Sequence, residues 1–121
     1  MAKNYNGDGQ TVTLPAPAGG VIAGLPVVIG SLVLVPLDNA AEGEDFVGVT
    51  GGEWGGIPCD DALALGARVA MLEGEMVAAG TASATAPIGV LTSDPAGTAT
   101  VLIVQGMAAT QAELDAGTGG A

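Results

Sequence analysis

The sequence contains no histidine, a single cysteine and only two cationic residues, Lys3 and Arg68. Without histidine, a serine or cysteine nucleophile has no customary base, and a transition-metal site of the histidine and cysteine kind is excluded by counting. Cys59 cannot form an intramolecular disulfide, so we interpret it as a small buried hydrophobic residue. We therefore expect no enzymatic activity, no catalytic residue, no metal and no cofactor.

Aromatic residues are also scarce, because the chain of 121 residues holds only Tyr5, Phe46 and Trp54. Any core must be built from Val, Leu, Ile, Ala and Met, each large aliphatic contributing about 1.5–3 kcal/mol when buried. Trp54, in the stretch GGEWGG, admits two interpretations. It is either a core residue or an interface anchor, since tryptophan is enriched at binding hot spots.

Positive charge is nearly absent, and thirteen acidic residues give the chain a net charge of -11. Nucleic acid and anionic membrane surfaces are disfavoured as partners, because both are bound largely through lysine and arginine. The acids cluster at 42–45, 60–61 and 73–75, but none of these clusters has the pattern of a calcium loop. We interpret them as a solvated acidic surface. A carboxylate pair for glycoside hydrolysis is disfavoured by the lack of aromatic platforms.

No charged residue lies between Asp8 and Asp38, a run that includes APAGGVIAGLPVVIGSLVLV at residues 16–35. Proline or glycine interrupts this run every few residues, which excludes a membrane-spanning helix, and no convincing cleavage site marks a signal peptide. We predict buried β-strands at 27–29 and 32–35, with Gly30 and Ser31 forming a bulge or kink between them.

Short branched aliphatic runs alternate with glycine-rich punctuation along the chain up to residue 105. Seven or eight strands at this spacing predict an all-β fold, either a small β-barrel or a β-sandwich. Residues 73–75 predict a tight hairpin and residues 93–97 a turn. One or two helical turns are expected at 60–66, and Thr110 to Glu113 form a capping-box pattern.

These patterns divide the chain into three parts. Residues 1–20 are predicted to form an extended N-terminal arm, residues 21–106 a compact β domain, and residues 107–121 a flexible tail rich in alanine and glycine.

Several motifs follow one another in a definite order: AKNY at 2–5, APAGG at 16–20, GLPVVIG at 24–30, GARV at 66–69, IGV at 88–90 and TVLIV at 100–104. In this order and spacing they resemble a family of small tailed-phage proteins catalogued as the domain of unknown function DUF2190, which includes capsid decoration or cement proteins. The resemblance covers about residues 1–105.

The resemblance implies a structural virion protein that decorates and stabilises an HK97-like icosahedral head. The expected partner is the major capsid protein, bound on the outer capsid surface by a homotrimer that assembles in the host cytoplasm. The N-terminal arm would reach over neighbouring subunits, which makes Lys3, Asn4 and Tyr5 candidate capsid or subunit contacts, together with Trp54 on the β domain.

An alternative is a carbohydrate- or receptor-binding β module on a phage or bacterial surface. Such a module would need an exposed aromatic cluster, and only Trp54 with Phe46 could supply one within the predicted β domain.

Overall fold

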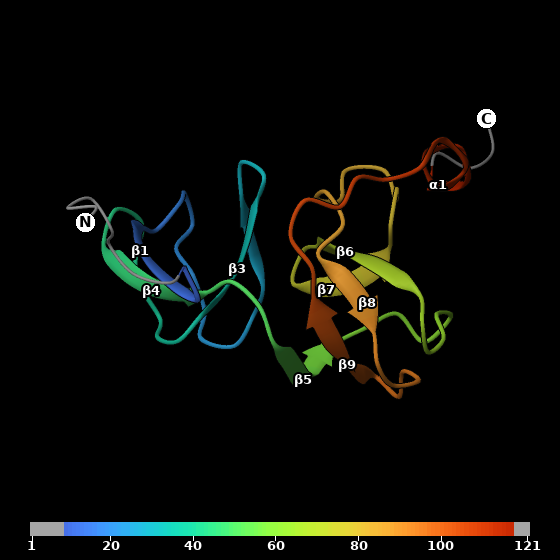
Figure 1. The fold of residues 1–121 in the computed structure, drawn as a ribbon, viewed down its shortest axis with the longest axis horizontal. Coiled ribbons are helices and arrows are strands. Elements are labelled where there is room, and N and C mark those ends of the chain that lie inside the picture. The colour runs from blue at the N-terminus through green and yellow to red at the C-terminus, as the bar shows by residue number, and fades with distance from the viewer. Residues whose placement is uncertain (1–8, 118–121) are drawn as a thin grey trace, which may run out of the picture.

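The computed structural model describes residues 9–117, which form two antiparallel β-sheets and one short helix (Figure 1). The first sheet has the strand order β1-β4-β3-β2 and consists of β1 (Thr11–Pro15), β2 (Val27–Ile29), β3 (Leu32–Pro36) and β4 (Asp45–Val49). The second has the order β5-β9-β8-β6-β7 and consists of β5 (Glu53–Pro58), β6 (Arg68–Leu72), β7 (Glu75–Ala78), β8 (Gly89–Leu91) and β9 (Thr98–Ile103). The helix is α1 (Gln111–Gly117). The prediction of an all-β fold is confirmed.

The five-stranded sheet curls until its two edge strands meet. Cys59, directly after β5, forms an isolated parallel bridge with Met76 of β7, and the next amide, that of Asp60, donates a hydrogen bond of 3.0 Å to the Met76 carbonyl. The four-stranded sheet packs against this curled sheet. The molecule thus has the two facing sheets of a small sandwich, with one sheet bent toward closure.

The chain reverses direction at Gly30 and Ser31, so the prediction of a bulge or kink at this point is wrong. Strands β2 and β3 pair as a hairpin with Ile29 opposite Leu32, which leaves these two residues as the whole connection. Gly30 has a φ of 62°, a left-handed value that a two-residue hairpin turn requires and that glycine adopts without strain. The predicted hairpin at 73–75 is confirmed, since Leu72 of β6 lies opposite Glu75 of β7.

A β-bulge at Gly55 and Gly56 explains the second glycine pair of GGEWGG. Trp54 lies opposite Val101 on β9, but the next paired residue is Ile57, opposite Ala99. Two residues of β5 therefore match one residue of β9, with Gly56 at a φ of 71°. In a regular strand, residues 54 and 57 are three apart and would point to opposite faces. The extra residue of the bulge lets both side chains pack toward the same core.

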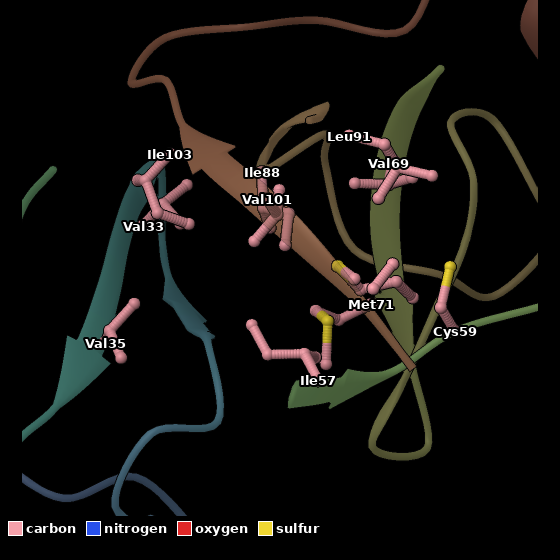
Figure 2. Close-up of a cluster of buried hydrophobic side chains, with 12 residues drawn as sticks. Val33, Val35, Ile57, Cys59, Val69, Met71, Ile88, Leu91, Val101 and Ile103 are labelled. Atoms are coloured by element: carbon pink, nitrogen blue, oxygen red, sulfur yellow. The ribbon is translucent and has the colours of Figure 1, made fainter. Parts of the chain in front are cut away.

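The larger core fills the space between the two sheets. Figure 2 shows Val33 and Val35 extending from β3 toward Ile57, Val101 and Ile103 of the five-stranded sheet. The whole cluster comprises Val33, Val35, Ile57, Cys59, Val69, Met71, Met76, Ile88, Leu91, Ala99, Val101 and Ile103. No polar or charged side chain is buried among the described residues. The core is therefore held by aliphatic packing, as the shortage of aromatic residues requires.

A smaller core lies on the other face of the four-stranded sheet. Leu34 and Phe46 point away from the five-stranded sheet and pack with Ala16 and Val21 from the loop that follows β1. Residues on β3 alternate between the two cores, which explains why this strand has an unbroken apolar sequence.

The predicted helical turns at 60–66 are wrong, because this segment forms non-helical turns. The Asp60 carboxylate accepts a hydrogen bond of 3.0 Å from the Ala62 amide, and the Asp94 carboxylate accepts one of 2.8 Å from the Leu65 amide. The Asp94 carboxylate thus takes the Leu65 amide that a helix over this segment would use for its own backbone bond, whereas the bond between Asp60 and Ala62 is compatible with a helix start.

Candidate interaction surfaces

The predicted arm and its contact residues are only partly within the described structure. Lys3, Asn4 and Tyr5 lie outside the described residues. From residue 11 onward the segment forms β1, an edge strand of the four-stranded sheet. The carbonyl of Gly9 accepts a hydrogen bond of 2.6 Å from the Thr50 hydroxyl, which fixes the point where the chain enters the sheet.

Trp54, the remaining predicted contact residue, lies on the face of β5 that points to the larger core. Its side chain is half-buried against that core, and its indole N–H donates a hydrogen bond of 3.0 Å to the Gly51 carbonyl. Gly51 belongs to the connection between β4 and β5. Trp54 therefore braces the junction of the two sheets, a position in which only part of its ring is available to a partner.

The two aromatic side chains within residues 9–117 do not form an exposed platform. Phe46 is only 3% exposed in the smaller core, whereas Trp54 packs against the larger one. A binding module for carbohydrate stacks sugar rings on exposed aromatic faces, so the structure gives no support to that alternative.

Gln105 is the residue that sequence reasoning missed. Beyond the end of β9, its side-chain amide accepts a hydrogen bond of 2.9 Å from the Val33 N–H and donates to the carbonyls of Val33 and Thr50. The amide thus occupies the place of a peptide group beside β3, where β4 has already ended. This one side chain joins the two sheets, and only the tertiary pairing of distant strands reveals it.

The segment after β9 crosses the β domain and ends in α1 (Figure 1). The predicted capping box is confirmed: the Thr110 hydroxyl accepts from the Glu113 amide at 3.1 Å, and the Glu113 carboxylate accepts from the Thr110 amide at 2.8 Å. The other carboxylate oxygen of Glu113 lies 3.5 Å from the Arg68 guanidinium, which also donates to the Ala108 carbonyl. Arg68, one of the two cationic residues of the chain, is thus paired with residues of the tail.

A close approach at Gly80 completes this attachment. A Cβ atom at position 80 would lie 2.4 Å from the Glu113 carbonyl carbon and 2.8 Å from the Leu114 amide nitrogen, so only glycine fits against α1 there. Beside this contact is a cleft of about 570 Å³. It is lined by the β2–β3 hairpin, residues 80–87 and residues 106–114, mainly with small apolar side chains.

Three acidic residues, Asp60, Asp61 and Asp94, accept backbone hydrogen bonds in the loops around the five-stranded sheet. Asp61 accepts a hydrogen bond of 2.7 Å from the Gly97 amide, alongside the bonds that Asp60 and Asp94 accept. Within residues 9–117, no group of three or more acidic or cysteine side chains is arranged to hold a metal ion. The most visible acid pair of the sequence therefore has a structural use in loop formation.

Cys59 is buried at 3% exposure, as predicted. Its burial, followed by the negative charges of Asp60, Glu75 and Asp61, raises the pKa of the thiol above its ordinary value. A reactive cysteine requires the opposite shift, so this site is unsuited to nucleophilic chemistry. Among the described residues, no helix has the length and apolar character needed to span a bilayer.

The comparison with protein families gives one match, and it covers most of the chain. The profile of the phage cement protein family matches residues 7–118. The chain belongs to this family. No curated protein and no solved structure matches it. Membership of the phage cement family implies a capsid decoration role, with binding to the phage capsid and association with the virion.

A cement protein needs surfaces that fit a shell rather than a catalytic cleft, and the exposed aliphatic residues mark candidate surfaces. Six large hydrophobic side chains are exposed on the described part of the chain: Ile22, Leu37, Val47, Leu65, Leu102 and Leu114. Val47 and Leu102 lie on strands, Leu114 lies on α1 and the other three lie in loops, so the charge around each one distinguishes a contact surface from an ordinary solvated position.

Proposed function

We propose that this cement protein binds the outer surface of an HK97-like phage head as a homotrimer and stabilises the expanded shell. The observation that carries the proposal is the family match over residues 7–118. The compact aliphatic β fold and the strongly acidic composition support it.

Stabilisation follows from linkage between binding and shell state. A protein that binds only the expanded lattice shifts the equilibrium toward that lattice by mass action. Many copies on one shell add their contributions, and a trimer that touches several capsid subunits gains further affinity from multivalency. No chemical step is required of any residue, in keeping with the loop-forming use of Asp60 and Asp61.

The N-terminal residues are the proposed clamp. Lys3 is one of two cations, and Arg68 is already paired with Glu113. Lys3 is therefore the cation we assign to a carboxylate on the shell, with Asn4 and Tyr5 adding hydrogen bonds and apolar contact. For Trp54 we propose an indirect part, in which its bond to Gly51 holds the sheet junction that faces the partner.

Co-sedimentation with expanded capsids that lack the cement protein tests the proposal. We expect saturable binding at a fixed ratio to the major capsid protein, weaker binding to unexpanded shells, and a higher melting temperature of decorated shells. Sedimentation velocity of the free protein measures the oligomer. Failure to bind either form of the shell would overturn the proposal.

Deletion of residues 2–8 tests the clamp separately. The deletion leaves Gly9, whose carbonyl accepts the hydrogen bond from the Thr50 hydroxyl. The start of β1 therefore keeps its attachment to the sheet. We expect an unchanged circular dichroism melt and at least tenfold weaker capsid binding. Lys3→Gln should reproduce part of this loss. Equal binding of the truncated and full-length chains would show that these residues are not the clamp.

A further inference from the structure

One face of the four-stranded sheet is only half covered. Val33 and Val35 of β3 point from this face into the larger core, whereas Phe46 of β4 points from the opposite face into the smaller core. Alternation along the strands therefore assigns Val47 and Val49 to the same face as Val35. The five-stranded sheet covers the β3 side of this face, but Val47 on β4 remains 37% exposed.

Strand register identifies the neighbours of Val47 on this uncovered region. Thr13 lies directly opposite it on β1, and Thr11 lies opposite Val49. On the other side, the Leu37 amide donates a hydrogen bond of 3.0 Å to the Val47 carbonyl, which extends the β3–β4 register by one residue. Leu37 is 48% exposed. We call the region formed by Thr11, Thr13, Leu37, Val47 and Val49 the neutral face.

The neutral face has a hollow at one end and an acidic residue at the other. A hollow of about 260 Å³ lies beside Val49, lined also by Gln10, Thr50, Gly51 and Gly52. At the opposite end Asp45 pairs with Pro15. Between these ends the face presents two threonines and three aliphatic side chains, without charge.

The acidic residues are unevenly distributed along the chain. None of the thirteen acidic residues lies within residues 9–37, which supply β1 and much of the first sheet. By contrast, the exposed Leu102 on β9 lies opposite Glu53, so the outer face of the five-stranded sheet carries charge beside its exposed aliphatic residue. Docking over Leu102 would remove the Glu53 carboxylate from water at a cost, whereas Asp45 lies at one end of the neutral face, where its carboxylate can stay in water while the rest of the face is dehydrated.

We propose that the neutral face is the surface that lies against the capsid shell, an inference that rests on the proposed function. Two observations select the shell as the occupant. Capsid binding is what membership of the cement family implies. Pairing of two copies through this same face would make a twofold dimer rather than the proposed trimer, and it would bring two net charges of -11 together across an uncharged contact. The hollow beside Val49 would receive a side chain of the capsid subunit.

Matched aspartate substitutions test the assignment in the full-length protein. Val47→Asp and Leu37→Asp place a carboxylate on the neutral face, within a strand and in a loop respectively. Leu102→Asp and Leu65→Asp are the corresponding strand and loop controls on the other sheet, at 44% and 61% exposure. All four variants carry the same added charge, so overall repulsion from the shell is equal. Circular dichroism melts verify folding, and Leu37→Asp preserves the test if Val47→Asp unfolds.

Capsid co-sedimentation provides the readout. We expect the two neutral-face variants to bind at least tenfold more weakly than wild type, and the two controls to bind within about twofold of it. Wild-type affinity in Leu37→Asp, or an equal loss in Leu102→Asp, would overturn the inference while leaving the proposed function intact. A changed sedimentation coefficient of the free Leu37→Asp protein would overturn it in favour of contact between copies. If wild type binds no shell, the proposed function fails and the inference fails with it.

Discussion

The two sheets of this cement protein share a core but differ in how completely their faces are covered. The four-stranded sheet draws most of its residues from a stretch without charge and leaves part of one face uncovered. The five-stranded sheet curls on itself, encloses most of the buried side chains and carries acidic loops. Under the assignment proposed above, the molecule separates two tasks: one sheet supplies stability, and the other supplies the surface that loses its water on the shell.

The largest expected effect compares the two cores with one substitution. Leu91→Ala in the larger core and Leu34→Ala in the smaller core both remove a side chain that is at most 1% exposed. Each should lower the free energy of unfolding by about 2–5 kcal/mol. Leu91→Ala should cost more, because half-buried residues border the smaller core and let it relax. Chemical denaturation measures the free energy of unfolding of both variants. A larger loss in Leu34→Ala would show that the smaller core contributes more to stability than the larger one.

A second prediction concerns Gln105, whose side chain joins the two sheets. Gln105→Ala leaves the Val33 amide and the Thr50 carbonyl without their side-chain partner, so unfolding should become easier by about 1–3 kcal/mol. Hydrogen exchange should show the four-stranded sheet opening before the five-stranded one. Gln111→Ala, which removes an exposed bond to Asp115, is the control and should change stability little. Equal changes in stability in the two variants would show that the Gln105 side chain does not hold the two sheets together.

The tail should respond with a smaller change in stability. Gly80→Ala forces a Cβ into the backbone of α1, and Arg68→Gln removes the partly exposed ion pair with Glu113. We expect limited proteolysis to cut near Gly106 in both variants, with a loss of about 1 kcal/mol or less for Arg68→Gln. Asp38→Asn, a charge change on an exposed residue of the other sheet, should leave the cleavage pattern as in wild type.

The smallest effect concerns Cys59. Since its thiol pKa is raised in the folded protein, the native state binds more protons than the unfolded state at alkaline pH. Stability from this residue is therefore complete below the ordinary thiol pKa and declines as pH rises through it. A thiol reagent should react slowly with native protein and quickly in denaturant. Cys59→Ala should remove this part of the pH dependence, and rapid labelling of the native protein would contradict the assignment.

Local patterns predicted the elements well and their connections unevenly. Branched runs marked each strand, and Thr110 with Glu113 formed the expected capping box. The connection at Gly30 was harder, because a glycine in an apolar run is compatible with either a bulge or a hairpin until the register is known. The loop at 60–66 failed as a helix because its decisive acceptor, Asp94, is distant in sequence.

The sequence by itself determined that the protein is an all-β, aliphatic, acidic chain without histidine, because composition and periodicity are local properties. Its ordered motifs also pointed to the cement proteins, and the family match confirms that likeness. Only the tertiary structure decided that Gln105 joins the sheets, that Trp54 braces their junction, and that Leu37 and Val47 remain exposed together. Each of these depends on which distant strand lies alongside, and that choice is made by packing across the whole core rather than by any neighbouring residue.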